Sequence, residues 1–158
     1  MNELIINPAK TIAITGHRAI NADFDREKLK STLKKFIEKG FDTFLIGMAV
    51  GFDTMCFQEL EKLKEEKKDI RIIACIPCLT QSERFSKSQR EEYERLLSIA
   101  DDKILISKEY TKNCMQKRNE FMVNYACCVF AYLKRDFGGT KNTVEYAKKL
   151  NKMIVYID

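Results

Sequence analysis

The chain has 158 residues, of which 45% are hydrophobic and 32% charged, and its formal net charge is +5. This length gives room for one domain with a proper core, and the composition argues against intrinsic disorder. No apolar run approaches the roughly 18 residues that cross a bilayer, and no basic segment precedes the first short apolar stretch as in a secretory signal. We therefore expect one cytoplasmic domain over residues 1–158 with no membrane partner.

Short β-type runs alternate with helical patterns along the whole chain. In chain order we expect a strand at 11–15, a helix at 25–39, a strand at 43–46, a helix from about 52, a strand at 70–76, a helix at 86–100, a strand at 103–106, a helix at 115–126, a strand at 127–132, a helix at about 140–150 and a strand at 153–157. This alternation is typical of βαβ units, which build a mostly parallel sheet with helices on both faces. The expected fold is a single Rossmann-like, doubly wound α/β domain of about six strands with the first strand central. The order of the other strands cannot be read from the sequence.

Glycine-containing turns follow three of these strands and lead toward helices, at 15–18, 47–53 and 138–143. In an open α/β sheet, ligands bind at the carboxyl ends of the strands, and the start of the next helix attracts phosphate. Tight turns between strand and helix need glycine in any case, but three on one edge favour ligand binding. The expected ligand-binding residues in these turns are Gly16, His17, Arg18, Gly47, Met48, Ala49, Gly51, Asp53, Gly138, Gly139, Thr140, Asn142 and Thr143.

Two polar residues in these turns have a structural alternative. His17, the one histidine of the chain, could meet an anion together with Arg18, or it could be a loop histidine bonded to backbone. Asp53 opens a helix, where a carboxylate stabilises the helix dipole by about 0.3–1 kcal/mol without any function. We favour that role for Asp53, with a contact to a ribose as the alternative.

Arg118 interrupts an apolar stripe that Met115, Met122 and Tyr125 form at helical spacing. Burying a guanidinium without a partner is costly. The sequence therefore predicts a carboxylate of the domain, or an anionic ligand, beside Arg118.

Glu145 is the candidate partner for Arg118 if its helix faces the same cleft. The alternative is a capping box with Asn142, in which the glutamate holds the start of its helix. The sequence leaves both roles open.

The six cysteines favour reduced thiols over disulfides, because Cys127 and Cys128 are adjacent in an apolar run and Cys56 lies in a helical pattern. Cys75 and Cys78 have the spacing of a redox motif, but they end a strand instead of opening a helix, and no second close cysteine pair or histidine cluster accompanies them. We expect no metal and no cofactor.

Taken together, these motifs resemble the SLOG superfamily, most closely its YpsA-like branch, also known as DUF1273. The resemblance covers nearly the whole chain and depends on four runs of residues. They are Gly-Met-Ala-Val-Gly-Phe-Asp-Thr at 47–54, Ile-Pro-Cys at 76–78, Cys-Met-Gln-Lys-Arg-Asn at 114–119 with Met122 and Val123, and Gly-Gly-Thr at 138–140 with Asn-Thr-Val at 142–144. The resemblance implies a Rossmann-like fold that binds nucleotides or their derivatives, ADP-ribose-like molecules included, and it adds Arg118 and Asn119 to the expected ligand-binding residues. It also implies a homo-oligomer.

Two relatives within this superfamily imply competing functions. The LOG enzymes are phosphoribohydrolases that cleave the N-glycosidic bond of nucleoside monophosphates with an arginine and a glutamate, which fall on Arg118 and Glu145. The chain departs from the LOG glycine motif, because Phe137 replaces a proline, Lys141 a glycine and Asn142 a threonine. The DprA family, which binds single-stranded DNA, is similar at 47–53. Nothing in the sequence supplies the basic groove with interleaved aromatics that tracks a strand, so nucleic acid is not the expected partner.

Our first hypothesis is therefore a protein that senses or sequesters a nucleotide-derived signal, in bacterial or phage defence or counter-defence. The second is a LOG-like N-glycosidase in which Arg118 and Glu145 are catalytic. The third is DprA-like binding of single-stranded DNA.

Overall fold

The computed structural model describes residues 4–66 and 69–158. After a short 3-10 turn at Pro8–Lys10, strands and helices alternate strictly. In chain order they are β1 (Thr11–Gly16), α1 (Arg26–Glu38), β2 (Thr43–Ile46), α2 (Phe52–Glu65), β3 (Arg71–Ile76), α3 (Lys87–Ile99), β4 (Asp102–Leu105), α4 (Cys114–Asn124), β5 (Cys128–Tyr132), α5 (Gly139–Lys149) and β6 (Met153–Tyr156). Every expected element is present, with bounds shifted by at most a few residues.

The six strands form one parallel sheet in the order β4-β3-β2-β1-β5-β6. From β1 the chain builds outward through β2 and β3 to β4, and α4 then carries it back to the other side of β1. The fold is thus Rossmann-like with the first strand internal, as predicted. The direction of winding reverses between β1 and β5, where Gly16 pairs with Tyr132. This reversal is the place where open α/β sheets bind ligands.

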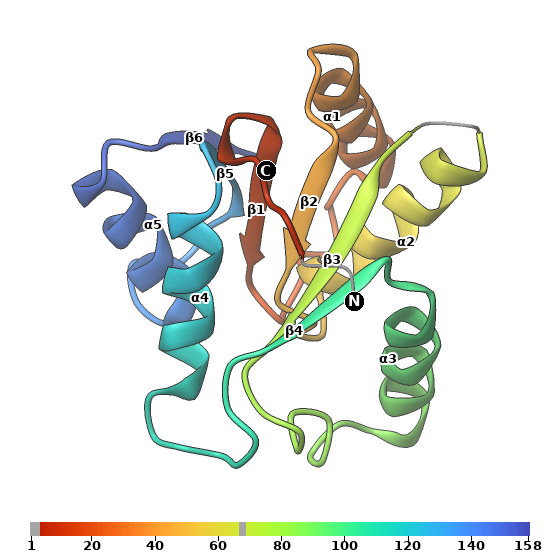
Figure 1. Cartoon of the computed structure of the whole chain (residues 1–158). Helices are drawn as coiled ribbons and strands as arrows, with labels where there is room; N and C mark the ends of the chain where they lie inside the picture. Colours follow the sequence, from red (N-terminus) through yellow and green to blue (C-terminus); the bar gives the residue numbers. More distant parts are fainter. Residues whose placement is uncertain (1–3, 67–68) are drawn as a thin grey trace.

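The helices cover both faces of the sheet: α1, α2 and α3 lie on one face, and α4 and α5 lie on the other (Figure 1). Alternate residues of each inner strand point to opposite faces. On the side of α1, α2 and α3, large side chains such as Phe44 and Phe130 pack into one core, whereas Ala13 and Ala131 allow α4 and α5 to approach the other face closely.

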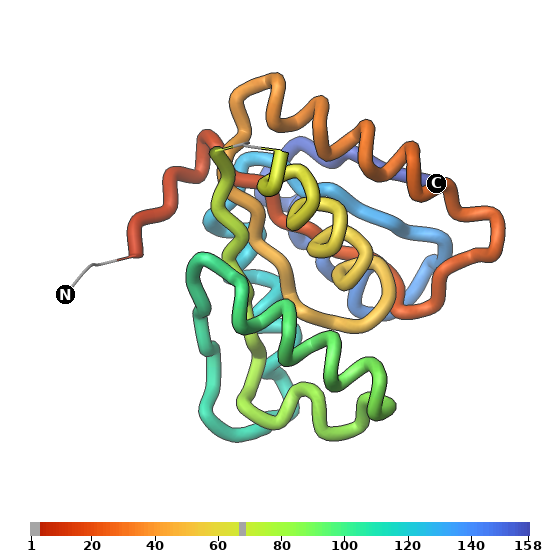
Figure 2. Tube along the Cα trace, turned by 90° about the vertical axis from the view of Figure 1, so that its right-hand side faces the viewer, coloured from red at the N-terminus to blue at the C-terminus, as the bar shows by residue number. Residues whose placement is uncertain are grey.

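The four inner strands are buried along almost their whole length, as the unbroken apolar runs predict. The edge strands β4 and β6 are partly exposed, because each has a neighbour on one side alone. Figure 2 shows the first described residues running out from one side of the body, while the carboxyl terminus lies on the opposite side. Within the described residues, no helix has both the length and the apolar character needed to span a membrane.

Candidate functional site

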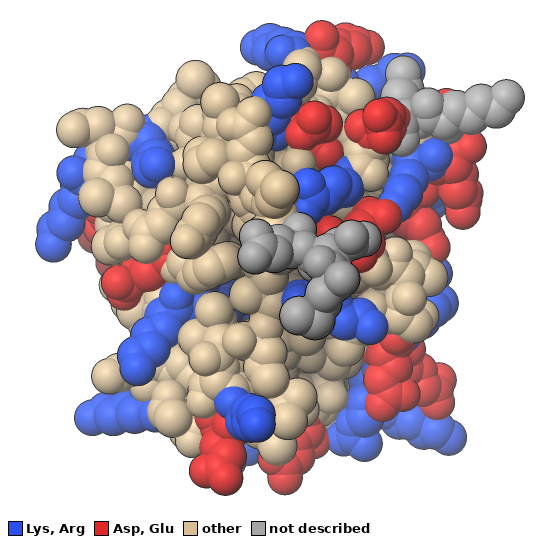
Figure 3. All heavy atoms as spheres, viewed as in Figure 1, with Lys and Arg blue, Asp and Glu red and all other residues tan. Residues whose placement is uncertain are grey.

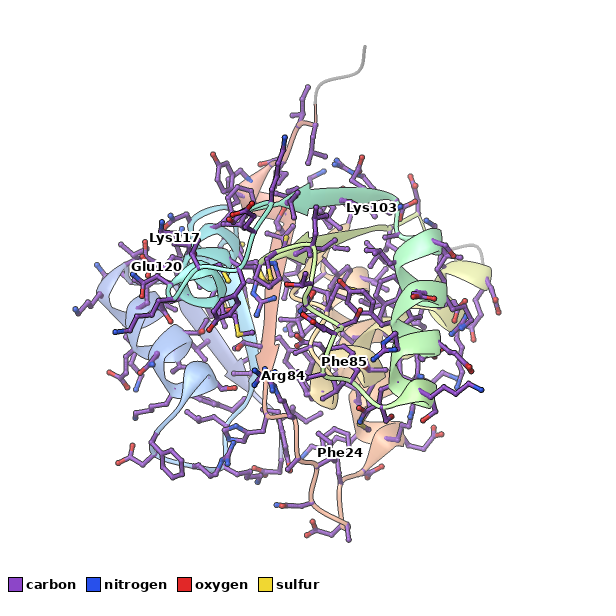
Figure 4. All side chains as sticks on the ribbon, turned by 90° about the horizontal axis from the view of Figure 1, so that it is seen from below. Phe24, Arg84, Phe85, Lys103, Lys117 and Glu120 are labelled. Carbon is purple, nitrogen blue, oxygen red and sulfur yellow. The ribbon has the colours of Figure 1, made fainter. Side chains whose placement is uncertain are left out.

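A pocket of about 300 Å³ opens at the carboxyl edge of the sheet, where the winding reverses. Its volume lies at the lower end of the range for ligand pockets, roughly 300–1,000 Å³. Figure 4 views the molecule toward this edge. Four segments contribute to the pocket, namely the three turns that follow β1, β2 and β5, and the first turns of α4. The lining residues are Ile14, Thr15, Gly16, His17, Arg18, Gly47, Ala49, Asp53, Met115, Arg118, Asn119, Arg135, Gly139 and Thr140.

Ten of the residues expected to bind a ligand line this pocket. They are Gly16, His17, Arg18, Gly47, Ala49, Asp53, Arg118, Asn119, Gly139 and Thr140. Five others lie in the same turns without lining it, namely Met48, Gly51, Gly138, Asn142 and Thr143. Met48 is buried in the core, and the hydroxyl of Thr143 donates to the carbonyl of Gly139 at 2.8 Å. Segments far apart in the sequence therefore converge on one hollow.

Arg118 is buried at the back of the pocket, with 7% of its surface exposed. Its Nε donates to Oδ1 of Asn119 at 2.7 Å, and its Nη1 donates to the carbonyls of Gly47 and Cys75. A Cβ at position 47 would lie 2.8 Å from the guanidinium carbon, so the glycine after β2 makes room for this side chain. The glycine is thus explained by packing within the protein.

The carboxylate that lines the pocket together with Arg118 is Asp53, whereas the candidate expected from the sequence is Glu145. Burial lowers the pKa of Arg118, and the charge of Asp53 opposes that shift. The expectation of a carboxylate near Arg118 is met by Asp53 on α2, whereas Glu145 on α5 lies outside the pocket lining.

Asp53 does more than stabilise the start of α2. It is 5% exposed, and its Oδ2 accepts a hydrogen bond from the backbone N–H of Ala49 at 3.1 Å. Its Oδ1 has no hydrogen-bond partner, and it is the one buried side-chain nitrogen or oxygen of the described residues in this position. Burial raises the pKa of Asp53 to about 6, against the opposing effects of Arg118, the Ala49 N–H and Arg18. The pocket therefore contains an acceptor that a ligand hydroxyl can satisfy.

His17 follows the structural alternative, although it also lines the pocket. Its Nε2 accepts hydrogen bonds from the backbone N–H groups of Lys134 and Arg135, at 2.7 and 3.2 Å. Burial and the nearby Arg135 guanidinium lower the pKa of His17, so the neutral ring is favoured. The imidazole thus ties the turn after β1 to the loop after β5.

Arg135 lines the pocket, and the sequence analysis did not select it. It lies between the carboxyl end of β5 and the glycine pair at 138–139, and a basic residue at that edge is the signal that could have identified it. The start of α5 lies beside it, with Gly138 as an N-cap that has no side-chain hydrogen bond. Gly139 and Thr140 then bring the first turn of the helix to the pocket. A helix start without a side-chain cap is favourable to an anion.

Glu145 does not line the pocket. Its carboxylate pairs with Lys141 at 3.0 Å and with Lys148 at 3.4 Å on the exposed side of α5. These hydrogen bonds lower the pKa of Glu145, with Lys141 as the larger cause. The capping box with Asn142 is also absent, because α5 begins earlier, at Gly139. Neither role that the sequence left open for Glu145 is realised.

The cysteine pair at the end of β3 has the environment of packing residues. Cys75 and Cys78 are both buried, and burial raises the pKa of Cys75 to about 12. A redox-active thiolate requires the opposite shift. Among the residues that the structure describes, no group of three or more histidine, cysteine, aspartate or glutamate side chains is placed to hold a metal.

The fold and the site together define a Rossmann-like protein with an arginine-rich pocket at its switch point. A model of the YpsA family, described as the YspA SLOG family, matches residues 11–157. The chain belongs to this family.

Curated relatives resemble the chain over most of its length. It is 28% identical over 137 residues to the uncharacterized SPbeta prophage-derived protein YoqJ of Bacillus subtilis (strain 168). The aligned region covers 78% of this chain and 80% of YoqJ. The chain is 26% identical over 160 residues to a UPF0398 protein of Bacillus thuringiensis (strain Al Hakam), which covers 93% and 87%.

Solved structures share the fold at lower identity. DNA processing protein A (DprA) of Streptococcus pneumoniae superposes with a TM-score of 0.69 at 15% identity, over 95% of this chain, which spans half of the DprA chain. DprA of Helicobacter pylori, described as binding single-stranded DNA, gives 0.68 at 16% identity, over 96% of this chain and 66% of that chain. TM1055 gives 0.59 at 13% identity, over 92% and 72%. At these identities the likeness concerns the fold alone.

Proposed function

We propose that the protein binds a nucleotide-derived small molecule, ADP-ribose-like or of the cyclic-nucleotide type, and holds it unchanged as a sensor or a sequestering protein. The observation that carries this proposal is the convergence of Arg18, Arg118 and Arg135 with the start of α5 on one pocket. Asp53 is the single acidic residue in its lining. Three cations against one carboxylate, beside free helix N–H groups, suit a phosphate.

The three arginines differ in how freely their side chains can move to contact a ligand. Arg118 is fixed by its hydrogen bonds to Gly47 and Asn119. Arg18 and Arg135 are exposed at the rim. This arrangement supports a fixed charge at the back of the pocket and two adaptable charges at its mouth, which together orient a phosphate-bearing molecule.

Binding without turnover is supported by the position of Glu145. A LOG-like mechanism needs a carboxylate at the sugar to stabilise positive charge or activate water. Glu145 is paired with Lys141, which stands where the LOG motif has a glycine, and it lies outside the pocket lining.

An N-glycosidase remains the second candidate function, and one observation favours it. Asp53 is a buried carboxylate in the pocket with a raised pKa, a property that is common among catalytic acids and bases. In that case Asp53, and not Glu145, would act on the sugar.

Titration calorimetry with ADP-ribose, cyclic ADP-ribose, AMP and NAD tests the proposal, with chromatography of each mixture for released base. We expect tight binding of at least one ligand, recovered unchanged. Arg135→Gln should weaken it about tenfold, since it removes a charge-assisted contact while its backbone bond to His17 persists. Lys134→Gln is the matched control, because Lys134 pairs with Asp158 and does not line the pocket.

Three outcomes contradict the proposal. Failure of all four ligands to bind overturns nucleotide recognition itself. Base release that disappears in Asp53→Asn replaces the binding protein with the N-glycosidase, and base release that disappears in Glu145→Gln restores the LOG-like assignment.

Binding of single-stranded DNA is the third candidate, which the fold shared with H. pylori DprA brings to this chain. Basic and acidic side chains intermix over α2 and α3 on the face drawn in Figure 3. On α3, Arg95 pairs with both Glu61 and Glu92. Paired charges of this kind do not form a basic track along a strand. Fluorescence anisotropy with a labelled oligonucleotide tests this, and salt-sensitive binding at micromolar protein would favour DNA.

We also propose a homo-oligomer, acting in bacterial or phage defence or counter-defence. The similarity to the prophage-derived protein YoqJ supports the link to phages. Light scattering at micromolar concentration tests the assembly, which a purely monomeric protein would contradict.

A further inference from the structure

A second, larger hollow of about 580 Å³ lies next to the pocket. The two hollows share Arg18 and Met115 in their linings, so they are neighbours at the carboxyl edge. The second hollow is bounded by the segment that joins β3 to α3, where Figure 4 labels Arg84 and Phe85, and by Tyr110 from the segment that joins β4 to α4.

The chemistry of the second hollow differs from that of the first. Its walls carry two aromatic rings, Phe85 and Tyr110, and two side-chain amides, Gln81 and Gln89. Aromatic faces stack on nucleic-acid bases, and the amide nitrogen of Gln89, whose oxygen accepts from the Ser86 N–H, can donate to a base edge. The first pocket, by contrast, offers arginines, a helix start and a lone carboxylate oxygen.

The wall of this hollow is held in place by bonds within the protein. The Arg90 guanidinium donates to the carbonyls of Ser82, Glu83 and Phe85, at 3.3, 2.9 and 3.2 Å. The ring of Phe85 meets Tyr93 edge to face at 5.6 Å. A segment fixed in this way presents its ring without a large loss of freedom on binding.

Gln81 connects the two compartments. Its amide nitrogen donates to the carbonyl of Gly47, which lines the first pocket, at 2.8 Å. Its amide oxygen accepts from the hydroxyl of Tyr93 at 2.9 Å. The distance between the hollows is therefore set by the fold and not by a free loop.

We propose that the second hollow is the base-binding half of a bipartite site, resting on the function proposed above. The base stacks on Phe85 and Tyr110, the bridging phosphates meet Arg18 and Arg135 at the mouth of the first pocket, and the terminal sugar enters that pocket. There a sugar hydroxyl donates to the unpartnered Oδ1 of Asp53. The ligand class is thus a nucleoside diphosphate that carries a second sugar.

Calorimetry with ADP-ribose and ribose 5-phosphate tests the division of the site. Tyr110 is 65% exposed, so Tyr110→Ala should leave the fold intact. We expect it to weaken ADP-ribose binding about tenfold, the order expected for a lost base stack, while ribose 5-phosphate binds as to the unaltered protein. Tyr110→Phe should restore ADP-ribose binding. Tyr156→Ala on β6, at a tyrosine that is 51% exposed, is the matched control.

The outcomes separate this inference from the proposed function. If ADP-ribose binds the unaltered protein and Tyr110→Ala equally well, the base subsite is wrong while nucleotide binding stands. If Tyr110→Ala weakens both ligands alike, the hollows are not separate subsites. If no nucleotide binds the unaltered protein, the proposed function fails as well.

Discussion

Both α4 and α5 begin at the same sheet edge, but Arg118 on α4 is buried whereas Glu145 on α5 is exposed. On α4, Arg118 is bonded to Gly47 and Asn119 and lines the pocket together with Asp53. On α5, Glu145 is exposed and shared between two lysines. The resemblance to LOG enzymes couples Arg118 and Glu145 as one catalytic pair, but the fold separates them into a fixed site residue and a solvated surface residue.

The difference in burial indicates which of these charged residues matters more for function. A buried charge must be compensated by its surroundings, so several groups are committed to Arg118. An exposed ion pair contributes little to stability and leaves its members replaceable. Arg118 and Asp53, which are both buried, should therefore have larger effects on stability and recognition than Glu145.

The largest effect is expected for Arg118→Met. The change leaves Asp53 buried without a compensating charge and frees the carbonyls of Gly47 and Cys75. Buried hydrogen-bonding groups that lose their partners cost about 1–3 kcal/mol each, so we expect the free energy of unfolding to fall by about 3–5 kcal/mol. Urea denaturation measures this, and Arg118→Met combined with Asp53→Asn should recover part of the loss. If Arg118→Met alone costs less than about 1 kcal/mol, Arg118 contributes no more than an exposed ion pair does, and the contrast between α4 and α5 fails.

A smaller effect, of opposite sign, is expected for Asp53→Asn. The pKa of Asp53 rises from 3.8 to about 6 in the folded protein, so its ionised form opposes folding by about 3 kcal/mol above pH 6. That penalty declines as the pH falls through 6 and is absent below 3.8. Asparagine imitates the protonated carboxyl, so the variant should be more stable at pH 7.5 and should lose this advantage by pH 4. Thermal unfolding across this pH range measures it, and a gain that does not vary with pH would contradict the assignment.

The smallest effect is expected for Glu145→Gln, because its ion pairs with Lys141 and Lys148 are exposed to solvent. The free energy of unfolding should stay close to that of the unaltered protein. ADP-ribose affinity, measured by calorimetry, should stay within a factor of about two, because Glu145 does not line the pocket. A loss of binding in this variant alone would return Glu145 to the site and remove the contrast.

The sequence predicts the elements of this fold well, because strand and helix patterns alternate without interruption. The apolar runs at 43–46 and 127–132 identify inner strands, and the glycine turns mark the edge at which the pocket lies. The strand order could not be predicted, since the side on which β5 returns depends on packing between elements distant in sequence. The partial exposure of β4 and β6 follows from that order and was equally hidden.

The site shows the same division between local and distant information. The burial of Arg118 could be predicted from its apolar stripe, and so could its need for a carboxylate. The identity of that carboxylate could not be predicted, because Asp53 and Glu145 each follow a glycine turn in the sequence. Only the fold shows that Asp53 lines the pocket and that Glu145 does not. Arg135 was missed since a loop residue has no periodic pattern to mark it.

One consequence follows from the contact between the turns after β1 and β2. Gly51, with φ of 85°, lies so close to Arg18 that a Cβ there would overlap the Arg18 carbonyl. The N–H of Phe52 donates to the carbonyl of His17 at 3.1 Å. The turns after β1 and β2 are thus held together before a ligand binds. A preorganised site loses little conformational entropy on binding, so differences in affinity among ligands should lie mainly in their dissociation rates.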